Sequence, residues 1–486
     1  MKKSPLQFLQ KNLASLPFAL CFCLPVYSGA LLLHYGLEAP YIILNSLLAP
    51  LAMWAFLKLP RALRFHFGFY VGLLLFYWVA LSFRFSPLPW LLPFVMFVVA
   101  LIYSLILGLL LSLQWVYFRV FALLVLGFIH PFGFDWLLPE AFFSYSVFGV
   151  DKFSFACALL GLVMIFFSPR KKQVRGQWGQ VWEPSSWGRS LARRTLGVVL
   201  LALACAQSEL LPARPPLSSA LTTALEVLPP KLAHQVRPLL PKSRQDSGSL
   251  DSVPLDSMPL HSAPLDFALT QPSIPQSLRW SPATFERIIA QNLALIDAAI
   301  DEGKEAIILP ETAFPTFLLQ STDLMQALRQ RSERIAIITG ALRKGEAGRI
   351  FNSTYIFQHT EVQILDKVIL APFGERIPLP DFLAKPLQKL FFNHSDAFTP
   401  APTPQDFTIN GITFRNAICY EGTSSLLYAS SPRFVIVISN NAWFYPSIEP
   451  ALQQMLLKYY ARITPSLILH SANFSHSMRI TPNLFD

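Results

Sequence analysis

The stretch FRNAICYEGTSS, residues 414–425, places one cysteine between an apolar, strand-like run and an acidic turn rich in Gly and Ser. Residues 265–486 around it alternate between strand-like runs and the helical stretches 282–303 and 448–462. Such alternation predicts an α/β domain whose sheets are covered by helices. The predicted strands are LDFALTQ, EAIILPE, RIAIITGAL and RFVIVISNN, with one hairpin of IFNSTYIF and EVQILDKVIL and another of DFTING and ITFRNAICYE.

Polar residues of chemical interest follow the ends of these predicted strands. Glu311 ends EAIILPE, Cys419 ends RNAICYE, and Asn440 ends RFVIVISN. Strand ends are where α/β domains usually build their sites. Cys419 is the only cysteine after residue 211, so a disulfide within the domain has no second thiol. A reactive thiol is one interpretation, and a buried inert cysteine is the other. A metal site is not predicted, because the domain's histidines lack ligand spacing.

The first part of the chain has the composition of a membrane protein. Of 486 residues, 53% are hydrophobic and only 14% are charged, whereas soluble domains carry about 25% charged residues. Runs long enough or nearly long enough to cross a bilayer predict an α-helical multispan domain of about seven helices over residues 1–211. The first run has a cleaved signal peptide as its alternative. The runs lie near 13–33, 39–57, 65–83, 90–113, 115–131, 153–167 and 195–211.

Lys and Arg gather in alternate loops between these runs, which predicts the orientation of the domain. Basic residues lie before the first run, after the second run and at the start of the fifth run. They are most frequent in the segment 170–194, which has a single acidic residue. The N-terminus is therefore expected in the cytoplasm and the α/β domain outside it. Much of the net charge of +10 then reflects topology, so no nucleic-acid partner is expected.

Residues 212–264 are predicted to be a linker rich in Pro, Ser and Leu. They contain a tandem pentapeptide, DSGSL, DSVPL, DSMPL and HSAPL, at 246–265. Because prolines remove backbone donors and favour extended conformations, a packed unit is not expected. The segment is interpreted as a flexible tether, with a partner-binding strip as the alternative.

Six short motifs then occur in order. They are QPSIPQSLRW (271–280), ILPETAFP (308–315), FNSTY (351–355), KVILAPFGERIP (367–378), ICYE (418–421) and NNAWF (440–444). Behind a multispan membrane domain, they make the chain resemble the nitrilase superfamily, and specifically its membrane-embedded branch, the apolipoprotein N-acyltransferases. The resemblance implies an α-β-β-α sandwich for residues 265–486. It also has departures: NNAWFYPS lacks the family's usual aspartate and glycine, and a shorter variant without a last transmembrane helix is expected.

The resemblance implies a catalytic triad in which Cys419 is the nucleophile, Glu311 the general base and Lys367 the cation. The chemistry agrees with these roles. A thiol is mostly protonated at neutral pH, a nearby carboxylate can take its proton, and an ammonium favours the thiolate and the oxyanion that follows. Supporting or substrate-binding roles are expected for Glu375, Tyr420, Glu421, Trp280, Asn352, Asn440 and Trp443. An amphipathic segment at 384–394 is interpreted as either a lid at the membrane or core packing.

The implied reaction transfers an acyl chain from a membrane phospholipid, through a cysteine thioester, to the N-terminal amine of a diacylated apolipoprotein. No cofactor and no metal are implied, and a monomer in the bacterial cytoplasmic (inner) membrane is expected, with its catalytic domain on the periplasmic side. Two alternatives from other classes are a membrane-tethered amidase and a catalytically silent scaffold that binds lipoproteins.

Overall fold

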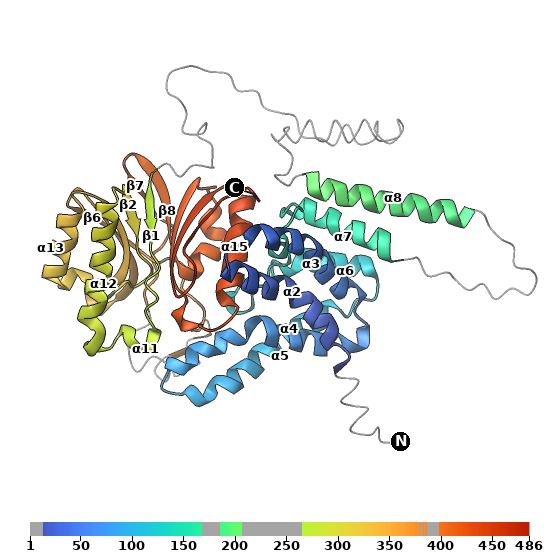
Figure 1. Ribbon diagram of the computed structural model, residues 1–486. Helices are drawn as coiled ribbons and strands as arrows, with labels where there is room; N and C mark the ends of the chain where they lie inside the picture. Colours follow the sequence, from blue (N-terminus) through green and yellow to red (C-terminus); the bar gives the residue numbers. More distant parts are fainter. Residues whose placement is uncertain are drawn as a thin grey trace, which may run out of the picture.

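The computed structural model describes residues 13–167, 185–206, 265–377 and 398–485, together with 379, 380, 382, 384 and 385. Within these ranges the chain forms a bundle of helices beside a layered α/β domain (Figure 1). The predicted linker 212–264 lies outside the described residues, and so does nearly all of the amphipathic segment 384–394. The predictions made for them are not tested.

Each apolar run predicted to be a helix is one. The helices are α2 (Leu16–His34), α3 (Glu38–Lys58), α4 (Arg64–Phe76), α5 (Leu92–Leu110), α6 (Val116–Leu126), α7 (Lys152–Phe166) and α8 (Ser185–Ala206). Among the described residues, four segments are long and apolar enough to cross a membrane: Leu16–His34, Glu38–Lys58, Arg61–Phe85 and Pro89–Leu110. The third of these continues from α4 into the 3₁₀ helix η2 (Tyr77–Phe85), a change of helix type that the sequence analysis missed.

Small residues let neighbouring helices of this bundle approach closely. A Cβ added to Gly68 or Gly72 of α4 would lie within 3.0 Å of the backbone or Cβ atoms of α5. Gly161 of α7 and Gly197 of α8 face each other in the same way. Close backbone contact through small residues is the usual way in which helices associate in a membrane. α2 belongs to this core, since Phe22 packs against Phe56 and Phe67.

The α/β domain consists of two sheets stacked face to face. The first has the order β1 (Phe267–Leu269), β2 (Ala306–Ile308), β4 (Ala336–Lys344), β5 (Ile350–Gln358) and β6 (Glu361–Asp366), with β3 (Phe314–Phe317) beside β4. The second has the order β11 (Met478–Ile480), β10 (Leu467–Asn473), β9 (Phe434–Asn440), β8 (Ile412–Ile418) and β7 (Asp406–Ile409). Both predicted hairpins are confirmed as the antiparallel pairs β5–β6 and β7–β8.

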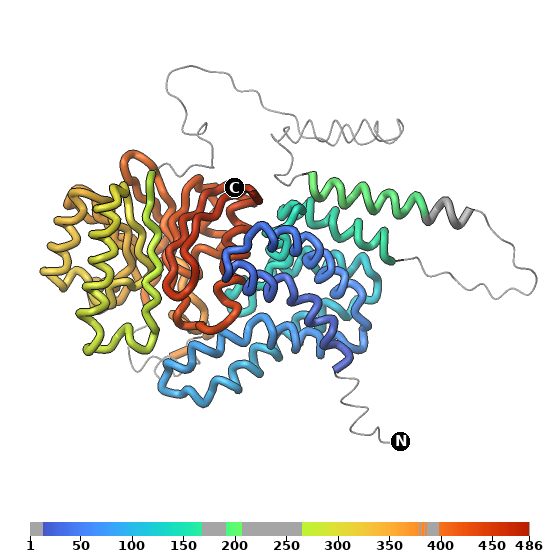
Figure 2. Tube along the Cα trace, viewed as in Figure 1, coloured from blue at the N-terminus to red at the C-terminus, as the bar shows by residue number. Residues whose placement is uncertain are grey.

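The alternation of side chains along the strands divides the interior into layers. In β2, Ile308 packs between the sheets, whereas Ile307 faces the outer helices. In β9, Ile436 packs between the sheets, whereas Val437 joins the core shared with the membrane helices. The helices α12 (Pro282–Asp301) and α13 (Thr322–Arg331) cover the first sheet, and α15 (Glu449–Ile463) covers the second (Figure 2). The α-β-β-α sandwich is therefore confirmed, and its second sheet faces the membrane helices across α15.

Candidate active site

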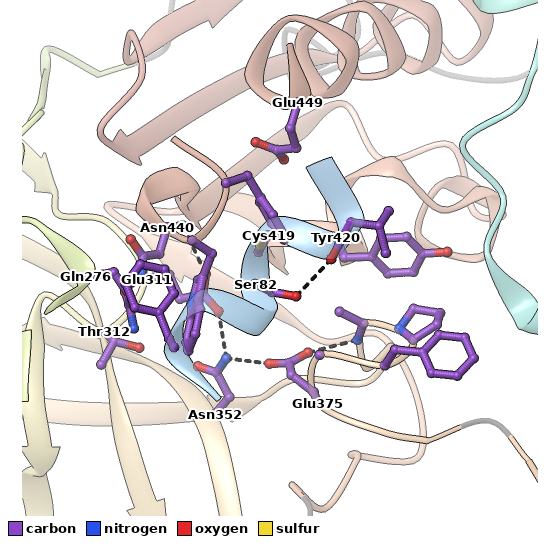
Figure 3. A pocket seen from close by; sticks show the side chains of 18 of the residues that line it. Ser82, Gln276, Glu311, Thr312, Asn352, Glu375, Cys419, Tyr420, Asn440 and Glu449 are labelled. Atoms are coloured by element: carbon purple, nitrogen blue, oxygen red, sulfur yellow. Dashed lines mark hydrogen bonds between the residues drawn. The ribbon is translucent and has the colours of Figure 1, made fainter. Parts of the chain in front are cut away.

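A cavity of about 260 Å³ lies where the two domains meet. Its walls come from the carboxyl ends of the strands on one side and from η2 and residues 134–136 of the membrane domain on the other. Figure 3 shows η2, which carries Ser82, crossing the cavity beside Cys419. Of the residues predicted for the site, all except Glu421 line it: Trp280, Glu311, Asn352, Lys367, Glu375, Cys419, Tyr420, Asn440 and Trp443.

Cys419 lies at the turn that ends β8. Its φ of 55° is in the left-handed region, which a residue with a Cβ adopts at a cost of about 1–2 kcal/mol. The 3₁₀ helix η10 (Cys419–Thr423) begins at this residue. Strained backbone persists only where the surroundings hold it in place, and such positions gather at functional sites. The turn exposes the Cys419 side chain to the cavity.

The backbone of η10 is held by Glu421, which lies beneath the cavity. One Glu421 carboxylate oxygen accepts hydrogen bonds from the backbone N–H groups of Val368 (2.8 Å) and Ile369 (3.2 Å), and the other accepts from Ile418 (2.9 Å). Burial raises the pKa of Glu421 to about 7 despite these donors. Glu421 thus connects the turn of Cys419 to the segment that follows Lys367, and its contacts are with backbone rather than with the cavity.

Glu311 lies three residues beyond β2 and is almost fully buried. Its Oε1 accepts a hydrogen bond from Asn352 Nδ2 at 2.7 Å, and its Oε2 accepts one from the backbone N–H of Asn440 at 3.0 Å. The loop that carries it is anchored by Arg279, whose Nη1 donates to the carbonyl oxygens of Glu311 (2.9 Å) and Thr312 (2.5 Å). The carboxylate is therefore fixed from two sides.

Lys367 follows β6 directly and is 1% exposed. Its Nζ lies 2.7 Å from Glu375 Oε2 and 3.9 Å from Glu311 Oε1. Asn352 joins the two carboxylates, since its Nδ2 donates to Glu311 at 2.7 Å and to Glu375 at 2.9 Å. One ammonium and one amide thus separate two buried carboxylates that would otherwise repel each other.

The electrostatics of the three central groups follow from burial and from these neighbours. Burial raises the pKa of the Glu311 carboxyl, and Glu375 raises it further, against the opposing effect of Lys367. Burial alone would lower the pKa of Lys367, but Glu375 and Glu311 outweigh it and raise that pKa. Burial and Glu311 raise the pKa of the Cys419 thiol, while Lys367 lowers it. The cavity thus combines a thiol, a carboxyl group and an ammonium whose pKa values are all raised.

Tyr420 connects the cavity to the membrane domain. Its hydroxyl donates to Asp135 Oδ1 at 2.7 Å, and its ring stacks against Phe134 and Trp136 with centroids 6.1 Å away in each case. The two predicted tryptophans are partly exposed at the cavity wall, at 50% for Trp280 and 37% for Trp443. Trp443 packs edge-on against Phe85 of η2, with ring centroids 5.5 Å apart.

Several cavity residues were missed from the sequence. Gln276 and Arg279 lie in the motif QPSIPQSLRW, from which only Trp280 was predicted to belong to the site. Trp78 and Phe83 of η2 lie in an apolar run that gives no sign of facing a site. Glu449, the first residue of α15, also lines the cavity. An acid in the first turn of a helix is an ordinary sign of a helix start, and nothing in the sequence distinguishes this one.

Comparison with known proteins places these features in a family. The description "Apolipoprotein N-acyltransferase integral membrane domain" matches residues 9–176. An apolipoprotein N-acyltransferase of Wolinella succinogenes is 39% identical over 96% of this chain and 94% of its own length, and one of Helicobacter pylori is 41% identical over 96% and 95%.

Solved structures give a weaker likeness. An amidase of the nitrilase superfamily from Nesterenkonia AN1 is 16% identical, with a TM-score of 0.34 over 45% of this chain and 83% of that one. The two relatives named above, each aligned with nearly the whole chain, show that the chain belongs to the apolipoprotein N-acyltransferase family.

Proposed function

We propose that this protein moves an acyl chain from a membrane phospholipid to the N-terminal amine of a diacylglyceryl-cysteine apolipoprotein, through a thioester on Cys419. The observation that supports the proposal is the cavity lined by both the membrane domain and the α/β domain. It brings Cys419, Glu311 and Lys367 together against an apolar wall from the membrane domain. A hydrolase of small amides would need no such wall, and a silent scaffold would need no buried Glu and Lys beside a thiol.

In the first step Glu311 takes the proton of the Cys419 thiol, and the thiolate attacks the sn-1 ester carbonyl of the phospholipid. Lys367 stabilises the oxyanion that develops, since an ammonium in a buried site acts with little screening. The intermediate collapses by breaking the ester C–O bond. The lysophospholipid oxygen receives the proton from Glu311, and the acyl chain stays on Cys419 as a thioester.

In the second step the amine of the apolipoprotein attacks the thioester carbonyl, the C–S bond breaks, and an amide and a free Cys419 thiol result. Both substrates carry acyl chains, so the bilayer must deliver them to the cavity from the side of η2. Holding the two reactants beside one thiol supplies orientation, which can provide much of the rate enhancement. We further propose the cytoplasmic membrane as the location, with the α/β domain on the periplasmic side.

The test is the acyl-enzyme itself. The full chain in detergent is incubated with phospholipid alone, and the peptide that contains Cys419 is analysed by mass spectrometry. We expect an acyl mass increase that neutral hydroxylamine releases. Cys419→Ala should lack it and should lose N-acylation of an apolipoprotein by at least about 10³-fold. Cys21→Ala, which removes a thiol of α2, is the matched control. Wild-type N-acylation by Cys419→Ala would overturn the proposal.

A further inference from the structure

Glu449 is a buried carboxyl that the mechanism above does not use. It is the first residue of α15 and is 1% exposed. Neither of its carboxyl oxygens has a hydrogen-bond partner among the described residues. It lines the cavity of Cys419, and Figure 3 shows it projecting from α15 on the side where Cys419 lies. An unpaired buried carboxyl is costly, so a partner of opposite charge or with N–H donors is expected to enter the cavity.

The helix start alone does not explain this side chain. A carboxylate in the first turn is favoured by the helix dipole, but the effect is about 0.3–1 kcal/mol at an exposed site and does not require burial. The backbone N–H of Glu449 donates to Ser447 Oγ at 3.1 Å, and the Glu449 carboxyl itself makes no capping hydrogen bond. The Glu449 side chain therefore lines the cavity without a hydrogen-bond partner among the described residues.

The charges of the cavity wall indicate what the partner is. Among the described lining residues the acids are Glu311, Glu375 and Glu449, and the cations are Arg279 and Lys367. Lys367 is paired with Glu375 and Glu311, and Arg279 is bound to the backbone of residues 311 and 312. With all five groups ionised the wall has one excess negative charge, and among its three described acids Glu449 is the one without a partner. The cavity therefore suits one additional cation with N–H donors.

We propose that Glu449 binds the primary ammonium of a substrate and accepts its first proton in the second step. This rests on the proposed function, because the acceptor amine must reach the Cys419 thioester as a neutral nucleophile. Burial raises the pKa of Glu449, and Glu311 raises it further, so the carboxylate is a strong proton acceptor in this place. The protons balance: one of the three ammonium protons goes to Glu449, one to the leaving Cys419 thiolate, and one stays on the amide nitrogen.

Two substrates carry a primary ammonium: the acceptor, at its N-terminus, and phosphatidylethanolamine, in its headgroup. We assign Glu449 to the acceptor, because Glu449 lies on the wall of the cavity that holds the nucleophile. A headgroup ammonium is separated from the reacting ester by the glycerol and phosphate, whereas the acceptor amine must contact the thioester carbon. The two sources require separate arms in the experiment.

The test uses the full chain with Cys419→Ala, so that binding is measured without reaction. The probes are a diacylglyceryl-cysteine peptide and the same peptide without its amine, each in detergent micelles. We expect the amine to improve affinity by about tenfold or more, as for other buried charge-assisted hydrogen bonds. Adding Glu449→Gln, which preserves shape, should reduce this difference to less than about threefold. Glu361→Gln, on the exposed edge strand β6, is the matched control.

The second arm compares phosphatidylethanolamine with phosphatidylglycerol as donors for thioester formation by the single variant Glu449→Gln. The assignment to the acceptor amine is supported if the variant forms the thioester from both donors at nearly the wild-type rate. Transfer of the acyl chain to the acceptor should then be slowed. A loss of thioester formation with phosphatidylethanolamine but not with phosphatidylglycerol would overturn this assignment. It would show that Glu449 binds the headgroup ammonium of the donor instead. An undiminished amine preference in Glu449→Gln overturns the inference while leaving the thioester mechanism intact. Absence of a thioester in the wild type would instead count against the proposed function.

Discussion

Asn352 illustrates how single residues set the protonation of this site. Its Nδ2 donates to both Glu311 and Glu375, and Lys367 lies 2.7 Å from Glu375 and 3.9 Å from Glu311. The two carboxyl groups thus share one amide donor and one ammonium. Because Asn352 and the Asn440 backbone occupy one position on each oxygen of Glu311, the base keeps a fixed direction while its remaining lone pairs stay available.

This arrangement predicts the pH dependence of thioester formation. Burial raises the pKa of Glu311 above the ordinary 4.5. The ionised carboxylate is the proton acceptor, so the rate should fall as the pH decreases, with a midpoint above 4.5. Single-turnover acylation of Cys419 measured against pH tests this. Glu311→Gln should slow acylation by about 10²–10⁴-fold and remove this acidic limb. A midpoint at or below 4.5 in the wild type would contradict the role of Glu311.

The sequence was most informative about residues whose chemistry is explicit. Glu311 and Cys419 were predicted at strand ends and Lys367 within a predicted hairpin strand, and the structure brings all three to one cavity; their catalytic roles stay predictions. Glu421 was expected to support the site, yet it contacts backbone N–H groups beside the cavity rather than its interior. Glu449 was missed, because only the packing of α15 against the second sheet directs a helix-start acid inward.

At the scale of elements, strands with an apolar run or a clear hairpin pattern were predictable, whereas the mixed strand β10 was not. β9 is apolar through Ile438 and was expected. β10 was not, since it reads LILHSAN and buries His470, Ser471 and Asn473. Each of these polar side chains has a tertiary hydrogen-bond partner, such as Ser439 Oγ at 2.9 Å from His470 Nε2. Such pairing is invisible in one strand's sequence. The short strand β3 and the helix α13 were missed as well.

The loop that carries Glu311 depends on one glycine in β4. A Cβ on Gly340 would lie 2.4 Å from Thr312 N and 2.7 Å from Glu311 Cα. Gly340→Ala should therefore displace Glu311 and slow thioester formation by about 10²-fold, which is the cost of misplacing a catalytic group by about 1 Å. The measurement is single-turnover acylation at saturating phospholipid.

Gly411→Ala is the control for Gly340→Ala. Gly411 has a φ of 81° in the β7–β8 turn and open space around it. Its substitution should cost about 1–2 kcal/mol of stability through backbone strain and leave acylation nearly unchanged. Equal acylation rates in the two variants would show that Gly340 does not position Glu311.

At the scale of the whole molecule, the two domains are joined by buried polar contacts as well as by apolar packing. Arg462 of α15 donates from Nη1 to the carbonyl oxygens of Phe143 (3.0 Å), Ser144 (2.9 Å) and Ser146 (3.2 Å), and from Nη2 to that of Phe148 (2.9 Å). These carbonyls belong to the end of the 3₁₀ helix η5 (Pro139–Phe143) and to the turns that follow it in the membrane domain. One guanidinium thus satisfies backbone acceptors that would otherwise be buried without donors.

Arg462→Leu should therefore destabilise the junction strongly. Each buried acceptor left without a donor costs about 1–3 kcal/mol, so a loss of several kcal/mol is expected. Thermal unfolding of the full chain in detergent, followed by tryptophan fluorescence, measures it. Arg329→Leu, on the exposed side of α13, is the control and should change the midpoint little. A midpoint for Arg462→Leu equal to that of the control would show that the apolar contacts suffice.

The ends of the membrane helices form two sets that differ in charge. At one end Arg119 donates to the carbonyl oxygens of Leu57 (2.8 Å) and Leu59 (2.6 Å), and Lys58 lies over the ring of Phe167 at 5.5 Å. At the other end the helices contact the α/β domain: His476 lies 2.8 Å from the carbonyl oxygen of His34. Arg84 likewise donates to the carbonyl oxygen of Tyr445 at 2.8 Å. Arg61 and Arg64, which lie between α3 and α4, share the end of Arg119 and Lys58, so that end holds more of these basic side chains than the cavity end, where Arg84 lies.

This separation predicts the orientation in the membrane, because loops rich in Lys and Arg stay in the cytoplasm. Segment 170–194 lies between α7 and α8 and includes the first part of α8, and it holds seven Lys and Arg residues. A reporter active only outside the cytoplasm should therefore be silent when fused after residue 180 and active when fused after residue 270. A reporter active only inside gives the complementary control. The opposite pattern would place Cys419 in the cytoplasm, and the proposed acylation of exported apolipoproteins would then lose its access to the acceptor.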